Sequence, residues 1–187
     1  MFGANDNNLI PLMLSAPRNI HFGPGTNLYD FTYGPNLADA HILAAVNLLT
    51  VSPADKSNLL SAAGKAFFVT NAEPMPFRDF LSQLWTTFDG KKPPKGVSIP
   101  TAVALPLVWL MEHVSKAVGK TPALTTKDLG DSLAERWFDN SRAAEVFGYV
   151  PKVKIADGLK EAAKDYEELK NGYEISLRDA SRPISNT

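Results

Sequence analysis

The feature that most constrains this fold is a short apolar run followed by an amphipathic stretch. Residues 66–70 (Ala-Phe-Phe-Val-Thr) are bounded by turn signals, which predicts a buried strand. After a polar loop, a helix is predicted from about Pro76 to Gly90. Its apolar face is formed by Phe77, Phe80, Leu81, Leu84 and Phe88. A strand, a loop and a helix in this order form half of a βαβ unit, which predicts an α/β fold.

The balance of charges and the lack of cysteine exclude several kinds of function. The 187 residues include 19 Lys and Arg against 20 Asp and Glu, a net charge of -1. Because nucleic-acid binding needs a clear cationic excess, no nucleic acid is expected as a partner. With no cysteine and three scattered histidines, no disulfide, thiol nucleophile or metal site is predicted. The first residues lack a secretory signal and no apolar run reaches ~20 residues, which predicts a cytoplasmic protein.

Further elements can be placed from turn residues and apolar spacing. The run Leu28–Tyr33 alternates like a strand, and Pro35 stands where a helix would begin. Residues 97–111 carry no charge, and Pro100 and Pro106 are expected to prevent one unbroken helix there.

The last third of the chain is predicted to be mostly helical. Asp139 or Asn140 can cap a short helix that ends before Gly148. A final helix starts near Ile155, with apolar residues at helical spacing as far as Leu169. We therefore expect a single domain over residues 1–170 and a polar, flexible tail over residues 171–187.

Four features could indicate chemistry, and each has a plainer explanation. Gly23-Pro24-Gly25 lacks the third glycine of a dinucleotide-binding loop and is followed by a predicted strand, so a turn is favoured. Tyr166 and Lys170 have Tyr-x-x-x-Lys spacing, but Tyr166 falls on the apolar face of its helix, which favours core packing. His41 is expected on the inner face of its helix as a hydrogen-bonded core residue. His113 could contact a ligand or lie at the surface.

Four segments, in order, resemble the 3β-hydroxysteroid dehydrogenase/isomerase family of extended short-chain dehydrogenases. They are residues 28–45, residues 67–77, the stretch 137–151 with its Phe-Gly-Tyr-Val-Pro sequence, and residues 155–159. Gly34-Pro35 departs from the family pattern, as does the turn after Phe2. The resemblance covers the C-terminal half of the family only. It implies the C-terminal part of a Rossmann-like fold, mostly helical with a few short strands, without the N-terminal Rossmann half.

The resemblance also implies what this chain holds and what it lacks. Family members use NAD or NADP, but their glycine-rich loop and Ser/Tyr/Lys set lie in the other half. No catalytic, cofactor-binding or metal-binding residue is therefore assigned here, and no cofactor is expected for this chain alone. The C-terminal half supplies the substrate pocket, which for a sterol-like ligand must be mostly apolar. We expect Tyr29, Tyr33, Trp109 and His113 to contact that ligand.

Three functions stay open at this point. The chain can be a truncated 3β-hydroxysteroid dehydrogenase-like oxidoreductase, inactive in hydride transfer by itself. It can be a binding or accessory protein for an apolar ligand or a full-length partner. It can also be a cofactor-independent isomerase or cyclase that acts by positioning.

Two further expectations concern the surface of the protein. Apolar residues near the N-terminus (Phe2, Leu9, Ile10, Leu12 and Leu14) would lack partners, which predicts self-association or pairing with a Rossmann-bearing partner. The uncharged run 97–111 lies between Lys91, Lys92 and Lys95 and the later Lys116 and Lys120. Apolar residues beside lysines predict peripheral contact with a membrane, such as that of the endoplasmic reticulum.

Overall fold

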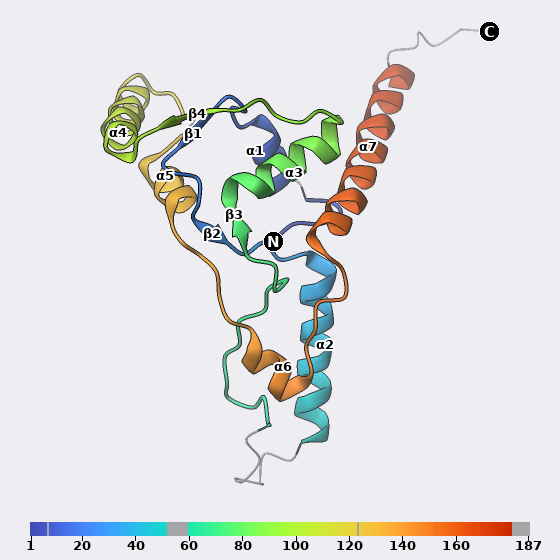
Figure 1. Cartoon of the computed structure of the whole chain (residues 1–187). Helices are drawn as coiled ribbons and strands as arrows, with labels where there is room; N and C mark the ends of the chain where they lie inside the picture. Colours follow the sequence, from blue (N-terminus) through green and yellow to red (C-terminus); the bar gives the residue numbers. More distant parts are fainter. Residues whose placement is uncertain (7, 52–59, 123, 181–187) are drawn as a thin grey trace, which may run out of the picture.

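The computed structural model describes residues 1–6, 8–51, 60–122 and 124–180, with side chains given as far as residue 168. Seven helices and four short strands lie in this part of the chain (Figure 1). The helices are α1 (Leu9–Ser15), α2 (Gly34–Thr50), α3 (Phe77–Asp89), α4 (Thr101–Ala117), α5 (Thr126–Leu133), α6 (Ser141–Phe147) and α7 (Ile155–Ala180). The strands are β1 (Ile20–Phe22), β2 (Leu28–Tyr29), β3 (Met75–Pro76) and β4 (Val97–Ile99). The predicted α/β fold, mostly helical with a few short strands, is confirmed.

The strands form two small sheets that join distant parts of the sequence. β1 pairs with β4 in parallel, with Ile20 opposite Val97 and Phe22 opposite Ile99. β2 pairs with β3 in antiparallel, with Leu28 opposite Pro76. The predicted strand from Leu28 to Tyr33 is thus shorter than expected, although Tyr33 forms an isolated bridge with Phe2. These pairings bring the N-terminal segment beside α3.

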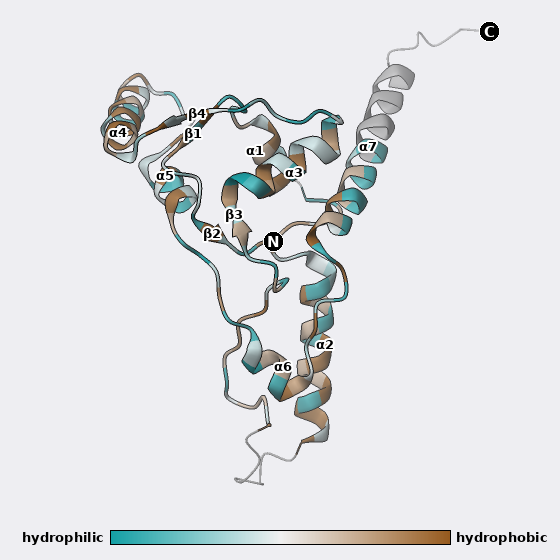
Figure 2. Ribbon diagram, viewed as in Figure 1, coloured by the Kyte–Doolittle hydropathy of each residue, from teal (hydrophilic) through white to brown (hydrophobic). Residues whose placement is uncertain are grey.

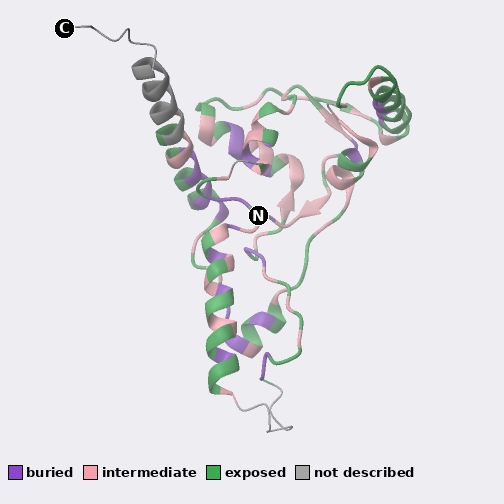
Figure 3. Cartoon of the chain, turned by 180° about the vertical axis from the view of Figure 1, so that it is seen from behind, coloured by how far each residue is buried: buried purple, intermediate pink, exposed green. Residues whose placement is uncertain are grey.

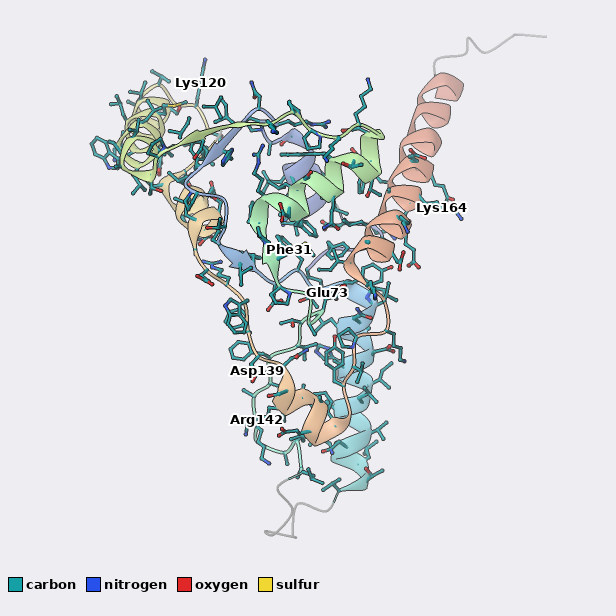
Figure 4. All side chains as sticks on the ribbon, viewed as in Figure 1. Phe31, Glu73, Lys120, Asp139, Arg142 and Lys164 are labelled. Atoms are coloured by element: carbon teal, nitrogen blue, oxygen red, sulfur yellow. The ribbon has the colours of Figure 1, made fainter. Side chains whose placement is uncertain are left out.

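The main core lies between the N-terminal segment, α3 and α7. Phe80 of α3 is fully buried and stacks on Phe31, with ring centroids 3.5 Å apart. Figure 4 labels Phe31, which lies next to α3. Phe2 meets Phe80 edge-on at 5.5 Å. Ile155 and Leu159 of α7 close the cluster from the other side. The helix predicted from about Pro76 to Gly90 is confirmed, since α3 buries its apolar face here and ends at Gly90 in the left-handed conformation.

The expectation of uncovered apolar residues at the N-terminus is wrong for most of them. Phe2 and Ile10 are buried, and Leu9 and Leu14 pack against the same cluster. Only Leu12 of the five is exposed. The reason is that α1 folds back onto α3, where the indole nitrogen of Trp85 donates a hydrogen bond to the Met13 carbonyl oxygen at 2.9 Å.

A second cluster holds the lower part of the molecule together in the view of Figure 1. It joins α2 to α6 through Ala40, Ala143 and Phe147. Of the two predicted capping residues, Asn140 makes no side-chain cap bond, whereas the Asp139 carboxylate accepts a hydrogen bond from Ser141 N at 2.8 Å. Gly148 ends the helix in the left-handed conformation, as predicted. Residues 66–70 pack Phe67 against this cluster but form no strand, so the predicted strand is wrong. The burial of its side chains alternates as in a strand, yet none of the described segments forms a ladder of backbone hydrogen bonds with it.

Helix α4 runs through Pro106, contrary to the prediction that prolines would break it. Pro100 precedes the helix, so only Pro106 is inside. The missing N–H leaves the carbonyl of Ala102 without its helical donor. Both residues are exposed, so water can satisfy that carbonyl and the helix continues.

Helix α7 is longer than predicted and reaches Ala180. The expected boundary at residue 170 therefore lies within the helix, while residues 181–187 are outside the described part. Tyr33 packs closely on α7, since a Cβ at Gly158 would lie 2.8 Å from the Tyr33 ring. Glycine at that position lets the helix approach the core.

A buried carboxylate holds α4 and α5 together. Glu112 accepts hydrogen bonds from Lys116 Nζ at 2.6 Å, and from Thr126 Oγ1 at 2.5 Å and Thr126 N at 2.8 Å. The hydrogen bond from Lys116, followed by the two from Thr126, lowers the pKa of Glu112 to about 2. The carboxylate therefore stabilises the fold above its unfolded pKa near 4.5, and this contribution is lost as pH falls towards 2.

We expect Glu112→Gln to lower stability at pH 7 and to have less effect at acid pH. Urea unfolding of both proteins at pH 7, 5, 4 and 3 measures this difference. The difference between the urea midpoints of the wild type and the variant should stay constant from pH 7 to 5 and become smaller below pH 4.5. A gap that is the same at every pH would contradict a role for the charge.

Candidate functional site

A groove of about 410 Å³ lies where three segments of the chain meet. Its walls come from the end of β2 and the residues after it, from the extended segment 68–70, and from the segment before α6. The lining residues are Tyr29, Asp30, Thr32, Phe68, Val69, Thr70, Arg136 and Phe138. The groove is thus formed by residues far apart in the sequence.

Backbone hydrogen bonds fix two of these segments side by side. Arg136 N donates to the Leu28 carbonyl oxygen and Asp30 N donates to the Arg136 carbonyl oxygen, both at 2.9 Å. This places Tyr29 opposite Arg136 in a parallel bridge. The two segments pair only at this bridge, because β2 has only two residues.

Aromatic rings form most of the apolar wall. Phe68 and Phe138 stack with centroids 4.4 Å apart, although 57% of Phe68 and 43% of Phe138 is exposed. Tyr29 contacts Phe31 at 4.9 Å and Phe77 edge-on at 5.4 Å, so its ring is held by the main core. Exposed stacked rings beside a groove offer a flat apolar surface to a ligand.

One carboxylate and one guanidinium supply the charge of the groove. Asp30 Oδ2 accepts a hydrogen bond from Phe138 N at 2.7 Å, while Asp30 Oδ1 is buried and has no partner within the described residues. Burial raises the pKa of Asp30, and the bond from Phe138 N partly opposes that shift. Hydrogen bonding to Tyr29 and the charge of Asp131 raise the pKa of Arg136. The groove can therefore accept a hydrogen bond at Asp30. Arg136 already forms an ion pair with Asp131, so an anion could bind there only by sharing the guanidinium with that carboxylate or displacing it.

The four residues expected to bind substrate do not lie together. Tyr29 lines the groove. Tyr33 is buried, and its hydroxyl donates a hydrogen bond to Glu161 of α7 at 2.5 Å. Burial and this bond raise the pKa of Tyr33 to about 12, so it stays a neutral, structural phenol. Trp109 and His113 lie on α4 with ring centroids 4.2 Å apart, outside the groove.

Sequence reasoning missed the charged members of the groove. Neither Asp30 nor Arg136 is among the residues that the sequence analysis singles out, because they lie in separate segments and belong to no motif. Phe68 was assigned to a strand interior, which hid its exposure. The available signal was the run 135–139, where charged residues surround two aromatic ones and which overlaps the start of the family-like stretch 137–151.

The plainer explanations of the other motifs agree with the structure, except at His41. Gly23 and Gly25 have positive φ in a turn between β1 and β2. Tyr166 packs edge-on against Phe88 at 5.7 Å, while the Lys170 side chain is outside the described part. His41 is exposed, not a core residue, and its Nδ1 lies 2.8 Å from the Leu37 carbonyl oxygen. It follows the buried Ala40 by one residue, which turns it about 100° away from the core.

The Gly23–Gly25 turn does not have the geometry of a dinucleotide-binding loop. A pyrophosphate needs a glycine-rich turn that opens directly into a helix, whereas the Gly23–Gly25 turn leads into a strand. A Cβ at Gly23 would lie 2.6 Å from Leu133, so side chains already fill this turn. No group of three His, Asp or Glu side chains that could hold a metal occurs among the described residues.

Comparison with known proteins identifies the family. The profile of the 3-beta hydroxysteroid dehydrogenase/isomerase family matches residues 1–100, more than half of the chain. Over 178 residues the chain is 33% identical to 3beta-hydroxysteroid-dehydrogenase/decarboxylase isoform 1 of Arabidopsis thaliana, covering 91% of this chain and 39% of that protein. The chain belongs to the 3β-hydroxysteroid dehydrogenase/isomerase family.

Two further comparisons agree with this assignment. Over 164 residues the chain is 35% identical to the decarboxylating sterol-4-alpha-carboxylate 3-dehydrogenase of Schizosaccharomyces pombe, covering 86% of this chain and 46% of that protein. The crystal structure of gox2253 superposes with a TM-score of 0.56 at 18% identity, over 89% of this chain and 46% of that one. The latter likeness concerns the fold alone. The chain spans less than half the length of these relatives.

Proposed function

We propose that this chain forms the substrate-binding part of a 3β-hydroxysteroid dehydrogenase-type oxidoreductase that acts on a sterol-like alcohol. The observation that supports this most directly is the groove, which combines stacked aromatic rings with one carboxylate and one guanidinium. Its volume of about 410 Å³ is in the range of small-molecule sites. A rigid, flat, apolar ligand with one or two polar groups fits that combination.

The charges of the groove suggest how such a ligand would be oriented. Several relatives are named sterol-4-alpha-carboxylate 3-dehydrogenases, so their substrate carries a carboxylate beside the alcohol. Arg136 is the one cationic side chain among the described lining residues and would pair with that carboxylate, sharing its guanidinium with Asp131 or releasing it. Asp30 Oδ1 lacks a partner and would accept a hydrogen bond from a hydroxyl. The ring system would then rest on Phe68 and Phe138.

A substitution at Arg136 tests this arrangement. The probes are a 3β-hydroxysterol with a 4-carboxylate and the same sterol with a 4-methyl group, with binding followed by tryptophan fluorescence because Trp137 adjoins the groove. Arg136→Ala should weaken binding of the carboxysterol by roughly tenfold or more, since a charged hydrogen bond is worth about 1.5–3 kcal/mol. Binding of the methyl sterol should change little.

The control is Arg142→Ala, which removes a guanidinium that lies over the Phe67 ring and not in the groove. This variant should bind both sterols like the wild type. Failure of the folded wild type to bind either sterol would contradict the proposal. Equal losses in the Arg136 and Arg142 variants would contradict the role of Arg136.

Hydride transfer is not expected from these 187 residues alone. We expect no saturable enhancement of NADH fluorescence at micromolar concentration, because backbone N–H groups at a glycine-rich helix start are missing from the described part. The measurement needs only the purified chain and a full-length family member as a positive control. Saturable binding by the purified chain would show that another segment holds the nucleotide.

A second proposal concerns a protein partner, and the segment 66–69 supports it. The side chains of this segment alternate as in a strand, and its backbone N–H groups make no hydrogen bond within the described structure. An unpaired extended edge is a template for another strand. We propose that a Rossmann-bearing partner pairs there, which would join a nucleotide site to this substrate-binding part.

A further inference from the structure

A second cavity, of about 170 Å³, lies between α3 and the segment that follows it. Helix α3 contributes Arg78, Asp79, Ser82 and Trp85 to its walls, and residues 93–95 form the other side. Figure 2 shows the segment from α3 to β4 mostly in the colours of hydrophilic residues. Figure 3 shows the same segment in the colours of exposed and intermediate residues. The cavity shares no lining residue with the groove that holds Arg136.

The walls of this cavity are partly apolar and rigid. Arg78, Ser82 and Trp85 follow each other at four- and three-residue spacing, so their side chains lie on one face of α3. Trp85 is buried, and its indole nitrogen already donates a hydrogen bond to the Met13 carbonyl oxygen. Its ring therefore offers only an apolar surface to the cavity. The prolines in residues 93–95 have a fixed φ, which makes the opposite wall stiff.

Arg78 brings a half-buried guanidinium to the cavity. The stem of its side chain packs at a turn, since a Cβ at Gly25 would lie 3.7 Å from Arg78 Cδ. Its guanidinium lies over Gly96, where a Cβ would lie 2.5 Å from Arg78 Nη2. Arg78 makes no hydrogen bond or ion pair with any described residue. Because half-buried donors of this kind normally have an acceptor, the guanidinium is available to a ligand.

The neighbouring histidine does not compensate the charge of Arg78. The ring of His21 lies at the same turn, since a Cβ at Gly25 would lie 3.5 Å from His21 Cδ2. Burial, followed by the charge of Arg78, lowers the pKa of His21, so this ring is neutral at pH 7. Its Nδ1 is buried and has no partner within the part of the chain that the structure describes.

The other polar groups of the cavity are two donors and one carboxylate. The side chains of Lys95 and Ser82 line it and form no hydrogen bond inside the described structure. Asp79 also lines it, but this carboxylate is exposed, so water and salt screen its charge. The lining therefore carries two cations, Arg78 and Lys95, against one screened carboxylate, which favours an anionic ligand.

We propose that this cavity binds a phosphate group, with the Arg78 guanidinium, the Lys95 ammonium and the Ser82 hydroxyl as donors. A guanidinium binds phosphate oxygens in pairs, and a lysine adds a point charge. The volume of about 170 Å³ equals that of about five or six water molecules at ~30 Å³ each, which admits a phosphate but not a whole nucleotide. A carboxylate, with fewer oxygens and a smaller charge, matches these donors less well. The proposal does not depend on the sterol groove.

Calorimetric titration of the full chain tests the proposal. The probes are inorganic phosphate and glycerol 3-phosphate, with sodium chloride added to hold the ionic strength constant. We expect saturable binding at one site per chain, and the tighter of the two probes shows whether the ligand is free phosphate or an organic phosphate. Arg78→Gln should weaken binding by about tenfold or more, the loss of a charged hydrogen bond. Arg78→Lys keeps the charge but loses the paired bonds, so it should restore binding only in part.

The matched control is Arg18→Gln. It removes a guanidinium that lies 5.6 Å from the centre of the Trp85 ring and pairs with Asp89, but does not line the cavity. This variant should bind phosphate like the wild type, and circular dichroism shows which variants are folded. Lys95→Gln changes an exposed residue, so it should weaken binding without unfolding the chain even if Arg78→Gln does not fold. A wild type that binds neither probe, or equal losses in the Arg18 and Arg78 variants, would overturn the proposal.

Discussion

Replacing Phe80 by alanine should destabilise the protein by about 3–5 kcal/mol, the range for a large aromatic residue removed from a core. Phe80 is fully buried and touches both Phe31 and Phe2 through its ring. The cavity would lie between the N-terminal segment and α3, and neither can close it without giving up its other contacts. Urea unfolding followed by circular dichroism measures the change.

An exposed apolar residue provides the comparison for Phe80. Leu49 of α2 is 87% exposed, so Leu49→Ala should change stability by no more than about 0.5 kcal/mol. If Phe80→Ala had an effect as small as that, the main core would not be organised around α3. A Phe80→Ala variant that does not fold at all would agree with a loss of stability at the upper end of the range of about 3–5 kcal/mol.

The second large effect is expected at a buried pair of asparagines. Asn36 Nδ2 donates to Asn71 Oδ1 at 3.0 Å and to the Val153 carbonyl oxygen at 2.7 Å. Asn36 Oδ1 accepts from the backbone nitrogens of Lys152 and Val153, both at 3.1 Å. Asn36→Ala would leave the partly buried backbone nitrogens of Lys152 and Val153 without their acceptor, and each unsatisfied group costs about 1–3 kcal/mol. We expect a loss of about 2–4 kcal/mol in the free energy of unfolding.

A subtler variant tests whether the donors matter. Asn36→Asp keeps the acceptor oxygen but brings a second oxygen towards Asn71 Oδ1 and the Val153 carbonyl, so it should also destabilise. Asn19→Ala, at an exposed position, is the control and should have little effect. A loss below about 1 kcal/mol for Asn36→Ala would mean that water replaces the amide.

Local patterns predicted the helices well because their determinants are close in sequence. The apolar face of α3 and the glycine that ends it lie within residues 77–90, and the same holds for α6 and Gly148. No local pattern predicted that Asn36 and Asn71 join α2 to the segment before α7. Asn36 and Val153 are 117 residues apart, and only the folded chain shows their bonds.

The errors arose where tertiary contacts decide the outcome. Residues 66–70 have the composition of a buried strand, but a strand needs a partner for its backbone hydrogen bonds, and none of the described segments pairs with them. Pro106 was predicted to break the helix. Because it is exposed, water can replace the hydrogen bond that its missing N–H cannot form. The groove could not be found from spacing, since Asp30, Phe68 and Arg136 come from three separate segments.

The described residues form three apolar clusters that share no buried residue: the main core, the cluster between α2 and α6, and a small one between α4 and α5. The small cluster holds α4 and α5 together. Ala104, Val108 and Leu129 are the only buried residues of that cluster among those described. Segments with few buried contacts open at a lower free energy than a main core does. We therefore expect the pair α4–α5 to open at a lower free energy than the core around Phe80.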